Sequence, residues 1–541
     1  MINKWCGALA TYFLLAPWAF SQNAHWINKV PPQLESQAQQ LTYLLDTQGY
    51  EVLRGYFKLY QDSDCPVAYY VMHTCYGNNP AAPYVIPVVP PWPSQPGPGE
   101  WVDPATIGAL GETLAGYNST YRLDPHEALI ILAQMPPPAS YFGEQTYLFT
   151  RAGELHTNSH QYEWINSNIQ YMVPTFFSLV PHEPESAPRV ELFADMGDSI
   201  NNVVIARKSA NPVWGQFRYF VITPNPAMDS GIRAAFANIG IADSAIFTEK
   251  IPDHVLGQTS APLVPEDTAL RFGLGPKADD FATVIRYAMP ADKTLGDLWR
   301  QDLPLVVLRV RNVEAGEQTY KWPGFEKRTP SQPPETWYNE TPQNDLDTLA
   351  KAVCAKWNQK DCVTTQFINL QLLPFKLTGP ECVVAWMNCL APGEDSTYLM
   401  SGKTPLHADD VYAVVGPLSI ATKNATYVGL GLNSTLKQEG FDNLSGDQLA
   451  GSAFGYTSAV PSEMFFVQYF ARDCSGLEGK WPTAVKFNCY SIGDKLPWCY
   501  DKYDEGCDML NLSLRGYIRP TTERSTDPRS VLNTRLILLH R

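Results

Sequence analysis

The 541-residue chain lacks several features that would place it in a familiar class of protein. It has no Cys-x-x-Cys pair, which argues against a thioredoxin-like redox site and against a zinc ribbon. Its lysines and arginines form no basic stripe and its formal net charge is −15, so nucleic acid and anionic membrane surfaces are unsuitable partners. No run of eighteen apolar residues follows residue 21, so no membrane span is predicted beyond that point.

The first 21 residues have the composition of a secretory signal peptide. Lys4 supplies the positive start, Cys6–Phe20 is an apolar run, and Ala19-Phe20-Ser21 is a small-x-small cleavage site. Cleavage there removes Cys6, one of eleven cysteines, and leaves an even number. We therefore predict a secreted protein, extracellular or periplasmic, that is stapled by disulfide bonds.

The remaining cysteines lie at the two ends of the chain, and none occurs between Cys75 and Cys354. The middle of the chain must therefore fold on its hydrophobic core alone. Short spacings favour local disulfides, but spacing does not determine the pairing. The residues expected in disulfides are Cys65, Cys75, Cys354, Cys362, Cys382, Cys389, Cys474, Cys489, Cys499 and Cys507.

The chain carries six Asn-x-Ser/Thr sequons. In a eukaryotic host such asparagines are glycan acceptors when they lie on exposed loops. The candidates are Asn118, Asn339, Asn424, Asn433, Asn443 and Asn511.

The pattern of apolar residues and prolines predicts an α+β, multi-domain protein that is rich in β-structure. The eight prolines of Pro80–Pro98 argue against a helix or a central strand there. No internal repeat of the length typical of solenoids or propellers is visible. The expected regions are a signal peptide (1–21), a helix and strand region ending in the proline-rich segment (22–103), a β-rich region (104–215), an α/β region (216–312), a loop-rich linker (313–345) and a cysteine-rich, mainly-β C-terminal domain (346–541).

Residues 216–312 give the clearest order of elements. A strand at Phe217–Thr223 precedes a helix that begins at Pro226, and a second strand follows at Ala245–Ile251. Two further strands, Phe281–Tyr287 and Leu305–Val310, flank a short helix. This βαββαβ order predicts a ferredoxin-like layer, in which two helices cover one face of an antiparallel sheet.

Gly197-Asp198-Ser199 follows an apolar strand and resembles the first block of the GDSL/SGNH hydrolases. The resemblance implies that Ser199 is a nucleophile with Asp198 beside it. That family also needs a histidine base three residues after an aspartate, and none of the nine histidines has that spacing. A tight turn capped by Asp198 and Ser199 explains the same residues.

Two groups of side chains could hold a metal ion. His156 and His160 are four residues apart, so on a helix both imidazoles would share one face. Asp501, Asp504 and Asp508 form an acidic loop that would suit calcium as a cofactor. Solvated surface residues are the competing interpretation of both groups.

Four tryptophans, Trp92, Trp101, Trp322 and Trp337, lie in proline-rich loops, where exposed rings can stack on a glycan or grip an apolar small molecule. The leading hypothesis is therefore an extracellular ligand-binding or interaction protein with an aromatic-lined surface. The alternative is a secreted hydrolase or metal-dependent enzyme centred on Ser199 or on His156 and His160. The sequence specifies neither the ligand nor the oligomeric state.

Overall fold

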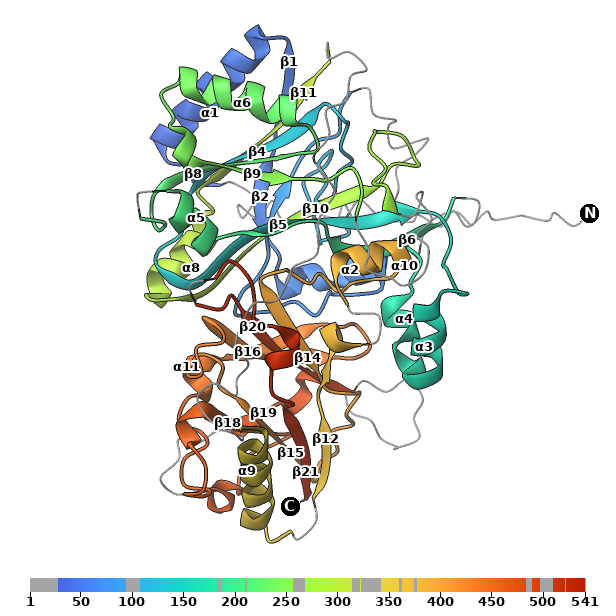
Figure 1. Ribbon diagram of the computed structural model, residues 1–541, viewed down its shortest axis with the longest axis vertical. Coiled ribbons are helices and arrows are strands. Elements are labelled where there is room, and N and C mark those ends of the chain that lie inside the picture. Colours follow the sequence, from blue (N-terminus) through green and yellow to red (C-terminus); the bar gives the residue numbers. More distant parts are fainter. Residues whose placement is uncertain are drawn as a thin grey trace, which may run out of the picture.

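The structure is a computed structural model, and it describes residues 28–93, 108–181, 187–209, 212–255, 268–313, 322, 342–359, 362–373, 377–482, 489–496, 509–520 and 522–540. Two halves are stacked along the long axis of the molecule (Figure 1). The first half ends at residue 313 and the second begins at residue 342, and each contains two β-sheets. Helices and sheets occur in both halves, which confirms the predicted α+β class.

Sheet I of the first half has the strand order β1-β11-β4-β8-β9, and sheet II has the order β2-β3-β10-β5-β6 with β7 beside β5. All neighbours are antiparallel except β8 and β9, which are parallel. The strands are β1 (Tyr50–Arg54), β2 (Tyr56–Leu59), β3 (Val85–Val88), β4 (Glu127–Gln134), β5 (Ala139–Ala152), β6 (Arg189–Asp195), β7 (Ile200–Asn201), β8 (Phe217–Thr223), β9 (Ile246–Lys250), β10 (Asp280–Pro290) and β11 (Leu305–Asn312).

Two helices of the first half, α1 and α6, cover the outer face of sheet I. Their apolar positions recur at helical spacing, as Leu34, Ala38 and Leu41 do in α1, and this stripe is buried against the sheet with that of α6. No helix in the described ranges is long and apolar enough to cross a membrane. The helices are α1 (Pro32–Thr47), α2 (Cys65–Met72), α3 (His160–Asn168), α4 (Val173–Phe176), α5 (Asn202–Lys208), α6 (Pro226–Asn238) and α8 (Lys293–Asp302).

The second half also has two sheets. Sheet III has the order β12-β21-β15-β18-β19, sheet IV has the order β13-β14-β20-β16-β17, and β18 and β19 are the one parallel pair among these strands. The elements are α9 (Pro342–Lys356), β12 (Val363–Gln366), β13 (Ile368–Asn369), α10 (Gly379–Ala385), β14 (Ser396–Met400), β15 (Asp410–Pro417), β16 (Tyr427–Ser434), β17 (Gly440–Ser445), α11 (Gly446–Leu449), β18 (Phe465–Ala471), β19 (Cys489–Ser491), β20 (Leu510–Tyr517) and β21 (Arg535–His540).

The two halves repeat one fold. Strands β1 to β6 correspond in order and pairing to β12 to β17, β8 and β9 to β18 and β19, and β10 and β11 to β20 and β21. Helix α1 precedes the first set as α9 precedes the second, and both helices pack on the outer face of their sheets. The described chain is thus a tandem duplication at the level of the fold.

Two disulfides occupy equivalent places in the duplication. Cys65–Cys75 lies between β2 and β3, and Cys382–Cys389 lies between β13 and β14. The first cysteine of each disulfide begins a Cys-x-Val-Ala sequence, which lies in α2 in the first half and in α10 in the second. The second cysteine of each is followed nine positions later by a tyrosine, Tyr84 or Tyr398. The other disulfides in the described residues are Cys354–Cys362 and Cys474–Cys489, whereas Cys499 and Cys507 lie outside them.

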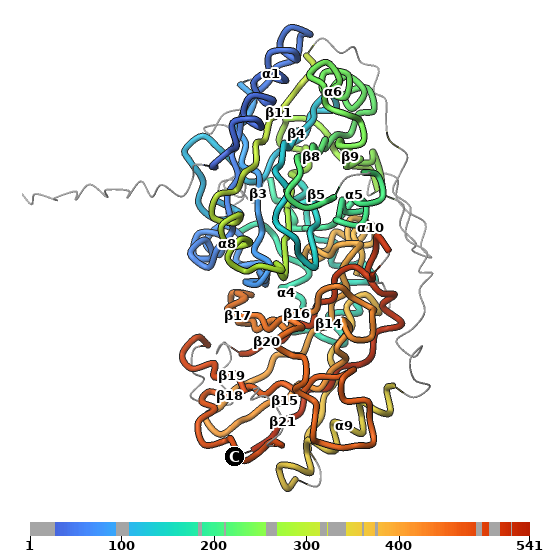
Figure 2. Tube along the Cα trace, turned by 90° about the vertical axis from the view of Figure 1, so that its left-hand side faces the viewer, coloured from blue at the N-terminus to red at the C-terminus, as the bar shows by residue number. Residues whose placement is uncertain are grey.

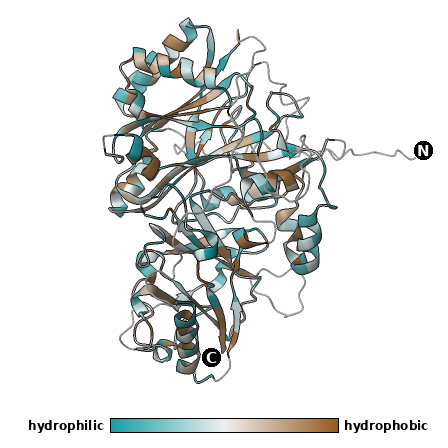
Figure 3. Ribbon diagram, viewed as in Figure 1, coloured by the Kyte–Doolittle hydropathy of each residue, from teal (hydrophilic) through white to brown (hydrophobic). Residues whose placement is uncertain are grey.

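The four sheets are stacked in the order I, II, IV, III, with α1 and α6 at one end and α9 at the other (Figures 1 and 2). Separate hydrophobic clusters lie between sheets I and II, between sheets III and IV, and under the terminal helices. Those helices carry both hydrophilic and hydrophobic residues, as expected for helices with one face on a sheet (Figure 3).

The predicted ferredoxin-like layer does not form. Strands β8 and β9 are parallel neighbours in sheet I, β11 is separated from β8 by β4, and β10 belongs to sheet II. Strands from 22–103, 104–215 and 216–312 pair within the same two sheets. The order of elements along 216–312 is as expected, but strands from earlier in the chain enter between them.

A Tyr-x-Gly sequence marks the same position in both halves. Gly143 of β5 pairs with Arg286 of β10, and Gly429 of β16 pairs with Arg515 of β20. A Cβ atom at Gly143 would overlap the hydroxyl of Tyr141, and one at Gly429 would overlap that of Tyr427.

We expect Gly143→Ala and Gly429→Ala each to lower the free energy of unfolding by about 1–3 kcal/mol, because a buried tyrosine ring must move to admit the new methyl group. Chemical denaturation measures this change. Gly275→Ala is the control, since no atom lies within 4 Å of a Cβ there. If both variants were as stable as Gly275→Ala, the close contact of these two glycines with the tyrosine hydroxyls would be contradicted.

Candidate ligand-binding site

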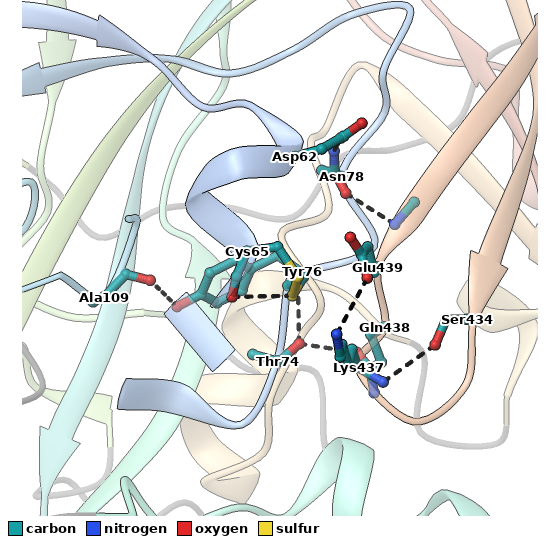
Figure 4. Close-up of a disulfide and its surroundings, with 12 residues drawn as sticks. Asp62, Cys65, Thr74, Tyr76, Asn78, Ala109, Ser434, Lys437, Gln438 and Glu439 are labelled. Atoms are coloured by element: carbon teal, nitrogen blue, oxygen red, sulfur yellow. Dashed lines mark hydrogen bonds and ion pairs between the residues drawn. A yellow bond between two sulfur atoms is a disulfide. The ribbon is translucent and has the colours of Figure 1, made fainter. Parts of the chain in front are cut away.

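The outer faces of sheets II and IV face each other, and each is covered by a loop of the other half. We define the first disulfide loop as residues 65–79 and the second disulfide loop as residues 382–391. In the first, the backbone N–H groups of Cys75 and Gly77 donate to Lys437 O (2.7 Å) and Gln438 O (2.5 Å). Figure 4 shows this loop against the turn between β16 and β17.

The second disulfide loop makes the reciprocal contacts. The N–H groups of Cys389 and Ala391 donate to Leu192 O (2.7 Å) and Phe193 O (3.0 Å) of the first half. An arginine from each sheet completes the exchange: Arg286 Nη2 donates to Ala391 O at 3.3 Å, and Arg515 Nη2 donates to Gly77 O at 2.5 Å. Ala391 and Gly77 are each the second residue after the second cysteine of their loop.

The outer face of sheet II is filled by aromatic side chains. Arg286 Nη1 donates to the hydroxyl of Tyr147 at 2.6 Å. The rings of Tyr147 and Phe149 each meet Phe193 edge-on, with centroids 5.1 Å apart. The buried cluster on this face includes Tyr84, Ile86, Tyr147, Phe149, Ala282 and Val284.

The equivalent face of sheet IV holds a cavity instead. Its open volume is about 830 Å³. The strand residues that line it are Tyr398, Met400, Asn433, Ser434, Asn511, Ser513 and Arg515, and Thr435 follows β16. Further walls come from the first half (Tyr76, Gly77, Met172, Thr175) and from segments of the second half that include Leu370, Leu377, Cys389 and Leu390.

Strand register explains why one face is full and the other hollow. Tyr147 lies four residues after Gly143 and pairs with Ala282, and Asn433 lies four residues after Gly429 and pairs with Asn511. Asn433 therefore takes the place of Tyr147, and by the same alignment Thr435 takes that of Phe149. The cavity opens where the second half has Asn433 and Thr435 in place of two aromatic rings.

Three polar atoms at the lining residues lack a hydrogen-bond partner within the described part of the chain. They are Arg515 Nη1, Asn433 Oδ1 and Gln371 Oε1, and all three are buried. Only 7% of Arg515 is exposed, so its guanidinium is largely removed from water. A buried donor or acceptor without a partner costs about 1–3 kcal/mol, more when charged, and a molecule in the cavity could offset that cost.

The lining of the cavity is positively charged although the chain is acidic. Lys403 and Arg515 belong to it, and no aspartate or glutamate does among the residues described. Lys403 is exposed and its ammonium lies 5.8 Å from the ring centroid of Tyr171. Arg515 stands 5.9 Å from the ring centroid of Tyr398.

The residues singled out in the sequence lie elsewhere. Ser199 is buried between β6 and β7, and its Oγ has no hydrogen-bond partner in the described ranges, so no base is engaged with it. Asp198 forms an ion pair with Arg524 at 3.0 Å. Neither Ser199 nor Asp198 lines the cavity.

The candidate metal ligands are not gathered into one site. The ring of His156 stacks on Trp386 with centroids 4.6 Å apart, and His160 begins α3. The described residues contain no group of three potential metal ligands. Asp501, Asp504 and Asp508 lie outside those residues.

The loop tryptophans have separate surroundings. Trp92 is buried, with Arg309 and Arg311 at 5.2 and 4.6 Å from its ring centroid. Trp322 donates from Nε1 to Thr223 O at 3.0 Å. Trp101 and Trp337 fall outside the described residues. The two that can be placed do not line the cavity.

Sequence reasoning missed a buried pair of carboxyl groups between sheets I and II. Glu144 of β5 and Glu249 of β9 are both buried, and Thr146 donates its backbone N–H to Glu249 Oε1 at 2.6 Å. Burial raises the pKa of both groups, and the neighbouring Glu249 raises that of Glu144 further. The site therefore favours the protonated form of these carboxyl groups more than water does.

Comparisons with known proteins give little to add to this geometry. No family model matches the chain, and no curated protein matches it. Among solved structures, an uncharacterised protein from Burkholderia cenocepacia is similar at a TM-score of 0.35 and 9% identity, over 94% of this chain and 87% of that one.

Four sequon asparagines, Asn424, Asn433, Asn443 and Asn511, are at most 9% exposed, which leaves no room for a glycan in the folded protein. We expect these four to be unmodified in folded protein secreted from a glycosylating host. Peptide mass spectrometry tests this directly. A glycan on any of them in a natively folded sample would contradict the packing around β16 and β20.

Glu191 of β6 predicts a pH dependence of stability. Burial raises the pKa of Glu191 to about 7, although the hydroxyl of Ser178 donates to it at 2.9 Å. The folded protein thus holds this proton more tightly than the unfolded chain does. The resulting stabilisation is complete below about pH 4.5 and is lost as the pH rises through 7, by about 3 kcal/mol in all.

We expect Glu191→Gln to reduce the fall in the free energy of unfolding between pH 5 and pH 8, as measured by urea denaturation. Exposed Glu163 provides the control, since Glu163→Gln should keep the wild-type slope. An unchanged slope in Glu191→Gln would show that this carboxyl is not the group that titrates.

Proposed function

We propose that this is a secreted ligand-binding protein that holds a small molecule in the cavity on sheet IV. One observation carries the proposal. Two arginines at equivalent positions are both buried, but Arg286 Nη1 has the hydroxyl of Tyr147 as its acceptor and Arg515 Nη1 has none in the described chain. The second half thus has a binding place where the first half has a packed core, and apolar walls with a few polar groups are typical of ligand pockets.

The disulfides support a location outside the reducing cytosol. Tyr76 and Gly77 follow Cys75 directly, and Cys389 itself lines the cavity. Both bonds are buried, so each disulfide loop holds a wall of the cavity in place. Disulfides with such a structural role persist in oxidising compartments, in agreement with the N-terminal signal-like segment.

Restoring the missing ring tests the proposal. Asn433→Tyr places a phenol where the first half has Tyr147, so we expect the variant to fill the cavity. In a thermal-shift screen of small aromatic and aliphatic compounds, ligands that raise the Tm of the wild type should have no effect on this variant. Leu436→Tyr is the matched control, because Leu436 lies on the same turn, is exposed and does not line the cavity.

The control variant should respond to ligands as the wild type does. A screen in which no compound raises the Tm would sink the proposal. So would a ligand whose stabilising effect survives in Asn433→Tyr, since it would then bind elsewhere.

A further inference from the structure

Resting on the proposed function, we infer that the ligand is a small aromatic acid. Its ring lies where the first half has the ring of Tyr147. Its carboxylate accepts a hydrogen bond from Arg515 Nη1 and lies in the field of Lys403. We infer the aromatic ring from the equivalent place in the first half, and we infer the carboxylate from the positive charge of the cavity lining.

The surroundings of Arg286 indicate an aromatic ligand. Its guanidinium carbon is 5.2 Å from the ring centroid of Tyr84 and 5.4 Å from that of Tyr147. Arg515 retains the first of these contacts, through Tyr398, and has Asn433 in place of the second. A buried guanidinium without a carboxylate partner is stabilised by such ring faces, so a ligand ring in this place restores the arrangement of the first half.

The charge of the lining indicates an acid. On sheet II the hydrogen-bond acceptor of Arg286 Nη1 is the neutral hydroxyl of Tyr147, and burial raises the pKa of this phenol well above its ordinary value. At the sheet IV cavity Lys403 adds a second positive charge and forms no ion pair with a described carboxylate. A carboxylate balances these charges and forms a charge-assisted hydrogen bond, about twice as strong as a neutral one.

The apolar walls leave room for the ring. Met172 and Thr175 approach from the first half, and Leu370, Leu377 and Leu390 from the second. The open volume of about 830 Å³ includes solvent at the mouth of the cavity, so it sets an upper bound on the size of a ligand. The ligand that we infer is therefore small, with one or two fused rings.

Three matched probes separate the two parts of the inference. Naphthoate has both ring and carboxylate, naphthalenemethanol has the ring without the charge, and decahydronaphthoate has the charge without the aromatic ring. In isothermal titration calorimetry at pH 7 we expect naphthoate to bind about tenfold more tightly than either of the others.

Charge variants locate the carboxylate. We expect Arg515→Gln to weaken naphthoate binding by about tenfold to hundredfold and naphthalenemethanol binding by less, because the alcohol loses the ring contact and the hydrogen bond of a neutral hydroxyl but no ion pair. Lys403→Gln, at an exposed position that should not disturb folding, should weaken naphthoate binding several-fold. Lys437→Gln is the control: Lys437 pairs with Glu439 at 3.9 Å outside the lining, so its loss should have no effect. If Arg515→Gln does not fold, Lys403→Gln decides the question.

The outcomes distinguish this inference from the proposed function. Equal affinities for naphthoate and naphthalenemethanol, or no effect of Lys403→Gln and Arg515→Gln on naphthoate binding, would show that the site does not require a carboxylate. An affinity for decahydronaphthoate equal to that for naphthoate would show that the site does not require an aromatic ring. Failure of all three probes overturns the inference, and the proposed function then stands or falls on the wider screen with Asn433→Tyr.

Discussion

The structure depends on a reciprocal exchange of loops between its halves. Each half has a sheet whose outer face must be covered, and in each case part of the cover comes from the other half. The main-chain bonds of Cys75 and Gly77 to one half, and of Cys389 and Ala391 to the other, fix the two disulfide loops in place. Arg286 and Arg515 then hold the carbonyl groups of the same loops. These contacts join sheets II and IV through the two loops, whose residues Gly77 and Cys389 also line the cavity.

The outer faces of sheets II and IV are equivalent in fold but differ in their side chains. On sheet II, Tyr147 and Phe149 complete a tightly packed cluster, and on sheet IV Asn433 and Thr435 leave space. Removing large side chains from a core normally destabilises it, by about 3–5 kcal/mol for a single phenylalanine. A cavity in place of these side chains therefore lowers stability, and such a loss is typical of functional sites, where stability and activity are traded against each other. The filled half therefore provides an internal reference for what the empty half lacks.

Part of the fold was predictable from the sequence. The proline start of α6 identified that helix, and the short cysteine spacings favoured the local disulfides that are observed. The segment Val67–Met72 is rich in residues that favour β-strands, yet it lies in α2, whose first turn contains a proline. Val85–Val88 is an inner strand despite Pro87. It pairs with β2 along its length, but its pairing with β10 is limited to Val85 and Ile285, so the missing N–H of Pro87 interrupts no long ladder. The duplication was hidden because insertions of different length separate equivalent residues: Tyr84 and Tyr398 lie further apart than Tyr141 and Tyr427. The site was hidden too, since Asn433 was identified only as the asparagine of a glycosylation sequon and Arg515 belongs to no motif.

The exchanged contacts have the form of an isologous dimer interface, in which residue i of one copy meets residue j of the other and the reverse also holds. Here both copies belong to one polypeptide. A true homodimer must change both of its sites together, because a single gene encodes them. A fused pair is free of that symmetry, so one copy can keep the supporting role of a scaffold while the other specialises.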